Sequence, residues 1–315
     1  MIRYTLGRCG RACITIFLVL SIVFLLMRLM PVETYFQGRS DTMTDTLKEN
    51  ILRGLGLLDP WYVALPNFWK NLLLHGDLGE SIVMRVGVPV TKVIWPKAVV
   101  SFQFGIISLA IQLVIGMPLG VLMARKKGGI IDKAGNLYVL LINSLPQAVY
   151  FLLIQLYLST LLGLPMLFKS SVPSSRILPI ICLSLGGIAS NAMWMRRYMV
   201  DQLNMDYIRL ARAKGMTSGQ VAFRHIFRNA LVPMVQSLPA SLLFTIYGYL
   251  YVDSLFSING MGGLLITSIQ RQDNPLVQAM VLLYSVISVL GLLLGDLAMM
   301  LVDPRITFTK KGGSR

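Results

Sequence analysis

The stretch Tyr207-Ile-Arg-Leu-Ala-Arg-Ala-Lys-Gly215 and the later Asn229-Ala-Leu-Val-Pro233 lie between two long apolar segments of the chain. A loop that only connects two membrane spans needs a few residues, whereas this basic segment runs from Arg196 to about Pro233. Its pattern predicts two short amphipathic helices, with Gly215 as the left-handed residue that ends the first. Such a segment lies at a membrane surface and presents a small, shaped surface to a partner.

The two predicted helices have separate apolar and basic sides. Asp206 is expected to cap the first helix, and Thr217 with Gln220 predicts a capping box for the second. The apolar sides are expected to carry Tyr207, Ile208, Leu210 and Ala211 in the first helix, and Phe223 and Phe227 in the second. The basic sides carry Arg209, Arg212 and Lys214, then Arg224 and Arg228. Contact with anionic lipid is the simpler explanation of such a loop, and the pattern alone leaves it open.

The composition places this loop in a membrane protein. Of the 315 residues, 55% are hydrophobic and 14% are charged, and apolar runs near the ~20 residues that cross a bilayer recur along the chain. We expect an all-α membrane protein with six transmembrane helices, the first of them an uncleaved anchor because no small-x-small cleavage site follows it. The spans are predicted at 12–30, 99–123, 137–162, 177–195, 234–252 and 276–302.

Lysine and arginine set the expected orientation. Most of the 29 basic residues fall in short segments on one side of the predicted spans, so the positive-inside rule puts both termini in the cytoplasm. The formal net charge of +15 is therefore a signal of topology, and it does not indicate nucleic acid because the basic residues do not gather on one soluble domain. The chain then divides into a cytoplasmic amino terminus (1–11), the first span (12–30), an extracytoplasmic region (31–98), a core of five spans (99–302) that contains the loop 196–233, and a cytoplasmic tail (303–315).

The loop resembles the cytoplasmic loop of bacterial importer permeases of the ATP-binding-cassette (ABC) class, whose pattern is Glu-Ala-Ala, three residues, then Gly. Counting back from Gly215, the Glu of that pattern falls on Arg209 and its second Ala on Ala211, so the Glu is missing here. The form Tyr-Ile-Arg-x-Ala-Arg-Ala-Lys-Gly, followed by Arg224-His-x-x-Arg-Asn-Ala-x-x-Pro233, is similar to the dipeptide, oligopeptide and nickel permease branch, in particular to its oligopeptide B-type subunits.

Segments outside the loop carry the same resemblance. They are Gly54-Leu-Gly-Leu-Leu-Asp-Pro60, Gly76-Asp-Leu-Gly79, the outer hairpin 253–275 and Asp303-Pro-Arg-Ile306. In the hairpin, Asp253, Asn259 and Asn274 replace the Glu, Pro and Tyr that the family usually has. The first two segments also have a purely structural interpretation, because glycine and proline clusters of this kind form turns.

Small residues and prolines indicate how the spans pack. Gly116 with Gly120 and Gly291 with Gly295 are spaced four apart, which lets helix backbones approach closely. Pro118 and Pro146 are expected to kink their spans, which frees carbonyl groups that neighbouring helices must satisfy.

The sequence does not predict an enzyme. It has no Gly-x-x-x-x-Gly-Lys-Ser/Thr loop to hold ATP phosphates, and His75 and His225, its two histidines, are expected on opposite sides of the membrane. We therefore expect no catalytic residue, no cofactor and no metal site, and no pattern indicates which residues contact a substrate. Within the predicted spans the ionisable residues are Arg28, near a helix end, and Asp296, which we interpret as a structural ion pair or helix cap.

The resemblance implies a type I ABC importer permease fold and a multi-pass protein of the bacterial cell membrane. It implies one half of the translocation path of an importer for oligopeptides or dipeptides. The implied partners are a second, related permease subunit, two ATP-binding subunits, an extracytoplasmic substrate-binding protein and the lipid bilayer. The residues implied to couple the chain to the ATPase subunits are Arg209, Ala211, Arg212, Ala213, Lys214 and Gly215.

Two alternatives to peptide import follow from the same sequence. The first keeps the machine and changes the cargo to nickel, a metal chelate or glutathione. The second is an ion-coupled secondary carrier, which the scarcity of ionisable residues in the predicted spans disfavours.

Overall fold

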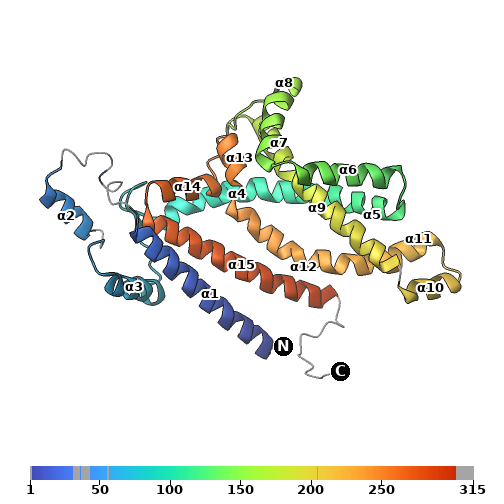
Figure 1. Ribbon diagram of the computed structural model, residues 1–315, viewed down its shortest axis with the longest axis horizontal. Helices are drawn as coiled ribbons and strands as arrows, with labels where there is room; N and C mark the ends of the chain where they lie inside the picture. Colours follow the sequence, from blue (N-terminus) through green and yellow to red (C-terminus); the bar gives the residue numbers. More distant parts are fainter. Residues whose placement is uncertain (1, 31–35, 37–42, 55–56, 204, 303–315) are drawn as a thin grey trace. The chain divides into compact units, whose positions relative to one another are not determined.

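The computed structural model describes residues 2–30, 36, 43–54, 57–203 and 205–302, and most of them are helical (Figure 1). The described residues form two compact units: those up to Val99 together with Asn259–Val289, and Val100–Ile258 together with the described residues from Leu290 onward. Helices α4 (Val90–Ile111) and α15 (Asn274–Val302) contribute a segment to each unit. The expected tail 303–315, which includes the family-like segment Asp303-Pro-Arg-Ile306, lies outside the described residues.

The first unit holds the amino-terminal span and most of the region predicted to be extracytoplasmic. Its elements are α1 (Ile2–Arg28), α2 (Asp45–Gly54), α3 (Trp61–Lys70), η3 (Asn71–His75), β1 (Glu80–Ser81), β2 (Val88–Pro89) and α14 (Met261–Gln270). The two short strands pair antiparallel, with Ser81 opposite Val88. Helix α3 continues directly into η3, so the chain is helical from Trp61 to His75.

Aromatic side chains of α3 pack along α1. The rings of Phe17 and Trp69 have centroids 4.7 Å apart, and those of Phe24 and Phe68 are 5.2 Å apart. The Trp69 indole also donates a hydrogen bond to Ser21 Oγ at 3.0 Å. Because α1 is an apolar span, this packing holds α3 against a membrane-embedded surface, which is the environment that amphipathic indole rings favour.

A buried carboxylate organises the rest of the first unit. Asp273 is fully buried, and its oxygens accept hydrogen bonds from the Ser81 hydroxyl at 2.5 Å and from the backbone N–H groups of Ile82, Val83 and Met84 at 2.9–3.3 Å. Charge-assisted hydrogen bonds to several donors offset the cost of burying this group. The carboxylate thereby joins the turn after β1 to the segment between α14 and α15.

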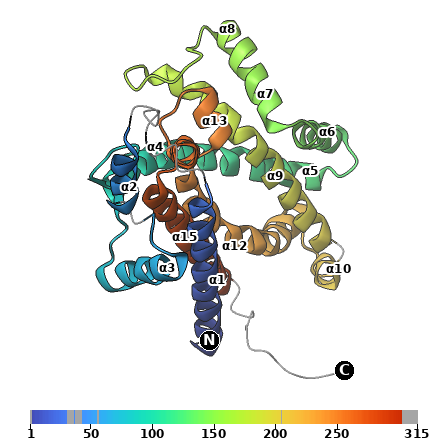
Figure 2. The same ribbon diagram turned by 60° about the vertical axis from the view of Figure 1, so that its left-hand side comes forward.

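The second unit is a helical bundle around α9 (Ile177–Leu203), which contacts α5, α6 and α12 (Figure 2). The remaining elements, in chain order, are η4 (Gln112–Gly116), α5 (Met117–Arg125), α6 (Ile130–Ser144), α7 (Gln147–Leu153), η5 (Ile154–Leu158), α8 (Ser159–Leu162), η6 (Pro173–Arg176), α10 (Asp206–Ala213), α11 (Ser218–Val221), η7 (Ala222–Phe227), α12 (Arg228–Phe244), η8 (Thr245–Tyr247) and α13 (Leu250–Leu255).

The glycine pairs lie at close helix contacts, as the sequence predicts. A Cβ on Gly116 would lie 2.9 Å from the backbone oxygen of Ile188, and one on Gly120 would lie 2.5 Å from that of Ala192, so both glycines admit α9. On α15, a Cβ on Gly291 would lie 2.9 Å from the Cα of Ala240 in α12. Any larger residue at these positions would push the helices apart.

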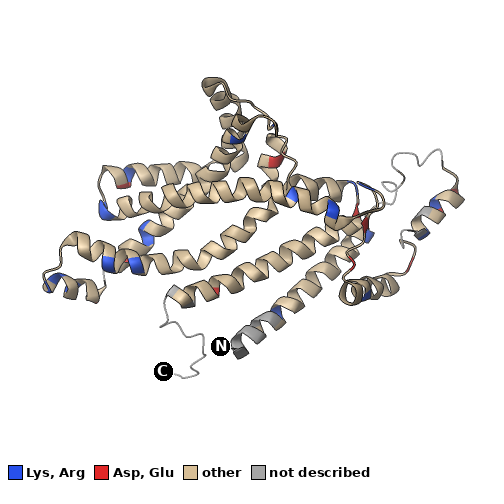
Figure 3. Ribbon diagram, turned by 180° about the vertical axis from the view of Figure 1, so that it is seen from behind, with Lys and Arg blue, Asp and Glu red and all other residues tan. Residues whose placement is uncertain are grey.

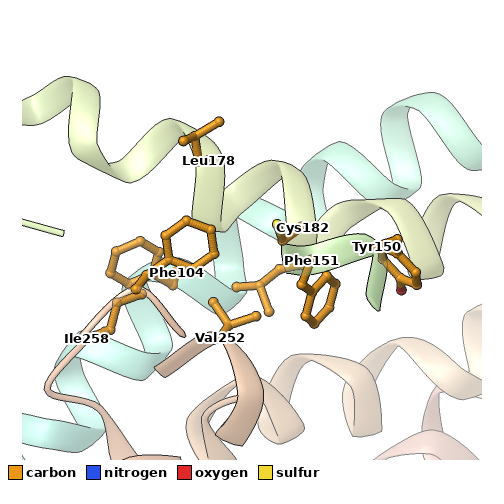
Figure 4. Packing of buried hydrophobic residues seen from close by; sticks show 9 residues of the cluster. Phe104, Tyr150, Phe151, Leu178, Cys182, Val252 and Ile258 are labelled. Atoms are coloured by element: carbon orange, nitrogen blue, oxygen red, sulfur yellow. The ribbon is translucent and has the colours of Figure 1, made fainter. Parts of the chain in front are cut away.

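Two hydrophobic cores lie at opposite ends of α9. One contains Leu178 and Cys182 near its start, packed with Phe104, Phe151 and Val252 (Figure 4). The other contains Met195 and Met199 near its end, where the basic helical loop begins. The second core is the one that positions the candidate site.

Among the described residues, five helices are long and apolar enough to span a membrane, and a bent pair counted as one span makes a sixth, which agrees with the predicted fold class. The five are Gly10–Arg28, Val90–Arg125, Pro173–Leu203, Ser218–Leu255 and Asn274–Met299. The second, third and fourth of these extend beyond both ends predicted from hydropathy, because polar residues on an exposed side do not stop a helix that its neighbours support.

The kink predicted at Pro146 is confirmed, whereas one predicted span begins earlier than expected. The segment 137–162 is not one straight helix: it is bent by 105° between α6 and α7, where Leu145 is extended and Pro146 has no N–H to continue the helix. The fifth span does not begin at 234. Pro233 lies inside α12, and the helical run starts at Ser218, so the second helix of the loop and the span are continuous.

Candidate functional site

The basic loop consists of two helical segments joined by a left-handed turn. Helix α10 ends before Gly215, which has φ = +80°, and α11 begins after Thr217. The Thr217 hydroxyl accepts a hydrogen bond from the Gln220 N–H, and the Gln220 side chain accepts one from the Thr217 N–H. The predicted turn and the predicted capping box are therefore confirmed.

The expected cap of the first helix is wrong. Met205 occupies the N-cap position of α10 and makes no side-chain capping bond. Asp206 is the first helical residue instead, and its carboxylate lies 3.5 Å from the Arg209 guanidinium, with both side chains exposed. Asp206 already has helical geometry, so it is not the N-cap residue. Its carboxylate instead interacts favourably with the positive end of the helix dipole.

Apolar residues on the inner side of both helical segments fill the second core. Ile208, Ala211, Val221 and Ile226 are each at most 5% exposed, and they pack with Met199 of α9. The same core includes Met195, Ala124, Ala230 and Met234, from α9, α5 and α12. The loop is therefore held by the ends of three spans.

A tyrosine joins three elements at the base of the loop. The Tyr207 hydroxyl donates to Gln202 Oε1 at the end of α9, and it accepts a hydrogen bond from Asn229 Nδ2 at the start of α12, at 2.9 Å. The Tyr207 ring also lies near His225, with centroids 6.3 Å apart. The sequence contains these residues, but nothing in their spacing indicates that they are connected.

The outer side of α10 is exposed and mostly basic. It presents Arg209, Leu210, Arg212, Ala213 and Lys214. Leu210 and Ala211 were both expected on the apolar side; Ala211 is 5% exposed, as predicted, whereas Leu210 is 57% exposed. The error at Leu210 arises because the direction of the helix axis relative to α9 decides which of two neighbouring residues faces the core.

The turn between α5 and α6 lies at the same basic end of the second unit as the helical loop (Figure 3). Asp132, in the first turn of α6, accepts two hydrogen bonds from the Arg196 guanidinium of α9, at 2.5 and 2.8 Å. The backbone N–H of Gly128 and the side-chain amide of Asn136 also donate to this carboxylate. The side chain of Asp132 is 4% exposed, so this bidentate pair connects the α5–α6 turn firmly to α9.

Aromatic residues line an apolar groove beside the helical loop. The rings of Phe223 and Phe227 stack with centroids 5.8 Å apart, as their placement on one side of a helix predicts. With Pro118 and Leu122 of α5 and Met199 of α9, they line a volume of about 510 Å³. Across the residues that the structure describes, no group of three His, Cys, Asp or Glu side chains is arranged to hold a metal ion.

Residues 116–308 match the family of binding-protein-dependent transport system inner membrane components. The match includes α5, α9, the whole helical loop and the spans that hold it. The chain belongs to this family. It is accordingly a multi-pass protein of the bacterial cell membrane, in agreement with the expected location.

Relatives of this permease are named as peptide permeases. The dipeptide transport system permease proteins DppB of Lactococcus lactis and Bacillus subtilis are 30% and 31% identical to it, over 97% and 99% of this chain and 99% and 100% of theirs. The oligopeptide transport system permease protein AmiC of Streptococcus pneumoniae is 35% identical over 70% of this chain. This chain spans less than half of AmiC, 45% of its length.

A solved structure supports the permease fold. The MetNI methionine ABC transporter in an inward-facing conformation has a chain that aligns with a TM-score of 0.53 and 21% identity, over 66% of this chain and 95% of that one. At this identity the likeness concerns the fold alone, and it agrees with the expected importer permease architecture. The cytoplasmic location of both termini stays a prediction from the positive-inside rule.

Proposed function

We propose that this chain is one membrane-spanning subunit of an ATP-driven peptide importer. Its family supports the role of a membrane component that works with a binding protein. The peptide cargo rests on the dipeptide permeases that align with the chain along nearly all of both lengths. The chain would line half of the translocation path, and a second, related permease subunit would line the other half.

We further propose that α10 carries the contact with an ATPase subunit. The coupling surface consists of Arg209, Leu210, Arg212, Ala213 and Lys214, the exposed residues of this helix and its end. One observation carries the proposal: α10 has two different sides. Its inner side is buried in a core shared with three spans, while its outer side is exposed. A push on such a surface moves the ends of α5, α9 and α12 together.

In this proposal ATP is hydrolysed by two partner subunits, and an extracytoplasmic binding protein delivers the peptide. When the two ATPase subunits close on ATP, they would move the coupling surface as a rigid body. This motion would switch the opening of the translocation path from one side of the membrane to the other. Ala211 and Gly215 act inside the loop, as a packing residue and as a turn, and they do not contact the ATPase. Arg209, Arg212, Ala213 and Lys214 keep the direct role that the sequence suggested.

Copurification and uptake test this function. The tagged chain, expressed with the genes that neighbour its own, should bring down an ATPase subunit and a second permease. The complex in proteoliposomes, with its binding protein, should accumulate the tripeptide Ala-Phe-Ala only when ATP is supplied. Absence of an ATPase from the purified complex would contradict the assembly, and uptake of peptide driven by an ion gradient without ATP would contradict the mechanism.

A further inference from the structure

A small pocket lies inside the second unit, among η4, α7, α9 and α13. Its volume is about 280 Å³, close to the lower end of the ~300–1,000 Å³ that small-molecule sites usually have. Its lining includes Gln112, Gly186 and Gly187, and these residues lie near the middle of the helices Val90–Arg125 and Pro173–Leu203. The pocket is therefore deep within the spans.

Three irregularities of the helices occur at this pocket. Gln112 begins the π-helical turn η4, Gln147 follows the 105° bend between α6 and α7, and Tyr249 follows the break at Gly248, where φ is +74°. All three of these residues line the pocket. Irregular backbone at membrane depth is tolerated where it is buried in protein or lines a cavity, and discontinuous helices often form the binding sites of transporters.

The polar side chains of the lining are uncharged. They are those of Gln112, Gln147, Tyr150, Tyr249 and Tyr251. Phe151, Leu183 and Val252 add apolar walls. The lining thus combines amide and hydroxyl groups with aromatic and aliphatic surface, and it contains no Lys, Arg, Asp, Glu or His.

Tyr150 contributes its hydroxyl group to the lining of this pocket. Its side chain is 94% buried, since 6% is exposed, and it packs edge-on against Phe151, near Cys182 and Val252 (Figure 4). Within the part of the chain that the structure describes, its hydroxyl makes no hydrogen bond. The hydroxyl oxygen instead faces Gly186, 3.5 Å from the point where a Cβ would lie.

Gln112 is held in place from the opposite wall. Its amide nitrogen donates to the backbone oxygen of Leu183 at 3.1 Å. The side chain lies where a Cβ of Gly187 would be, so the glycine is what allows Gln112 to rest on the backbone of α9. Nothing donates to Gln112 Oε1 among the described residues, which leaves an oriented acceptor at the pocket.

We propose that this pocket binds an uncharged main-chain segment of a peptide on its way through the membrane. A peptide group has one donor and one acceptor, which the amide and hydroxyl groups of the lining can match, and the aromatic walls can cover a neighbouring apolar side chain. A phosphate headgroup would need basic residues, which this lining lacks, and a nickel ion would need several imidazole, carboxylate or thiolate ligands, of which the lining offers one, Cys182. The inference rests on the proposed function and names the substrate contact that belongs to it.

Recognition of the main chain has a consequence for selectivity. Every peptide carries the same backbone groups, so the pocket would accept many sequences. Selection among peptides would then belong to the binding protein, and the pocket would affect the rate and efficiency of passage. Pocket variants should therefore lower the maximal uptake of peptide per ATP hydrolysed, and leave the peptide concentration for half-maximal uptake unchanged.

Two variants and a matched control test the pocket in the reconstituted complex with its binding protein. Tyr150→Phe removes the unpaired hydroxyl, and we expect uptake of Ala-Phe-Ala per ATP to fall about two- to tenfold, the effect of one lost hydrogen bond. Gly186→Leu fills the pocket, and we expect a loss of about tenfold or more. The control is Tyr138→Phe, because the Tyr138 hydroxyl donates to the Leu185 backbone at 2.8 Å outside the pocket. It should lower the melting temperature of the complex while uptake per ATP stays unchanged.

A photocrosslinking experiment measures contact directly. p-Benzoylphenylalanine in place of Tyr251, which is 59% exposed and lines the pocket, should become labelled by tritiated Ala-Phe-Ala during turnover. The same residue in place of Tyr157, which is 72% exposed on η5 and away from the pocket, should stay unlabelled.

The outcomes separate this inference from the proposed function. If the unsubstituted complex does not take up peptide, the proposed function fails and the inference falls with it. If the unsubstituted complex takes up peptide while Tyr150→Phe and Gly186→Leu have normal uptake per ATP, the pocket is not on the path and the proposed function still stands. Equal labelling at both crosslinking positions, or at neither during normal uptake, overturns the inference as well.

Discussion

The Asn229 side-chain amide donates a hydrogen bond to the Tyr207 hydroxyl, with 2.9 Å between the nitrogen and the oxygen, and the same hydroxyl donates to Gln202 Oε1. One atom thereby connects the end of α9, the start of α10 and the start of α12. If α10 couples to an ATPase as proposed, we expect this hydroxyl to transmit its motion to two spans, in addition to the buried apolar core.

Tyr207→Phe should weaken this connection without emptying the core. The ring stays in place, while two hydrogen bonds are lost, and we expect the complex to lose about 1–2 kcal/mol of stability. Thermal unfolding of the purified complex measures the loss, and uptake per ATP should fall with it. Tyr198→Phe is the control, because the Tyr198 ring stacks on Trp194 and its hydroxyl makes no hydrogen bond among the described residues. A similar effect of both variants would exclude a specific role of the Tyr207 hydroxyl.

Gly215→Val should misplace α10 through the backbone alone. A Cβ at Gly215 meets nothing within 4 Å, so space is not the constraint, but the residue has φ = +80°. Left-handed geometry costs an L-residue about 1–2 kcal/mol, and a β-branched residue is the least able to adopt it. We expect the complex to assemble, and its ATPase activity to persist with reduced uptake.

Two substitutions check that explanation for Gly215. Gly215→Asn should keep most of the uptake, because Asn tolerates the left-handed region. Gly219→Ala should be neutral, since Gly219 is equally open to solvent and has no positive φ. Normal uptake by Gly215→Val would remove the turn from the mechanism.

Tryptophan substitutions at Ala211 and Ala213 should have different effects. Ala211 is 5% exposed, so Ala211→Trp overpacks the core beneath α10 and should cost about 1–3 kcal/mol of stability. Ala213 is exposed, so Ala213→Trp should leave the melting temperature unchanged and reduce copurification of the ATPase subunit. Undiminished copurification of the ATPase with the Ala213 variant would show that the coupling surface lies elsewhere.

Neutralising and reversing a charge on the coupling surface should weaken ATPase association by different amounts. An exposed ion pair contributes about 0.2–1 kcal/mol, so Arg212→Ala should weaken ATPase association only slightly. Arg212→Glu loses the same ion pair and adds repulsion. If the facing surface of the ATPase is acidic, this variant should weaken ATPase association more than Arg212→Ala does. Titration of salt in the copurification assay measures the difference, which should shrink as screening increases. Equal association of both variants at low salt would contradict an electrostatic contact.

The Asp132–Arg196 pair should contribute to the stability of the basic end. Asp132→Asn removes the charge that accepts both guanidinium hydrogen bonds, and hydrogen bonds to charged groups contribute about 1.5–3 kcal/mol. The melting temperature of the complex measures the loss. Asp206→Asn is the matched control, because its carboxylate and its ion pair with Arg209 are exposed, so its removal should shift the melting temperature much less. An equal shift from both substitutions would contradict the role assigned to the buried pair.

Several features of the candidate site are local and were predictable from the sequence. The Thr217–Gln220 capping box depends on residues three apart, and the turn at Gly215 depends on one residue that tolerates a positive φ. The stacked Phe223 and Phe227 follow from their spacing of four on a helix. In each case the interacting groups are close in the chain, so their geometry follows from the helix itself.

The sequence by itself determined the class of the protein, its apolar spans and the loop between the fourth and fifth of them, because hydropathy and charge act on each segment separately. Tertiary structure alone decided that Leu210 faces outward, that Asp132 finds Arg196, and that Gln112, Tyr150 and Tyr249 share one pocket. These relations join residues on different helices, and they depend on how the axes cross and where the spans bend. No local preference specifies those angles; the packing of small residues such as Gly120 against α9 does.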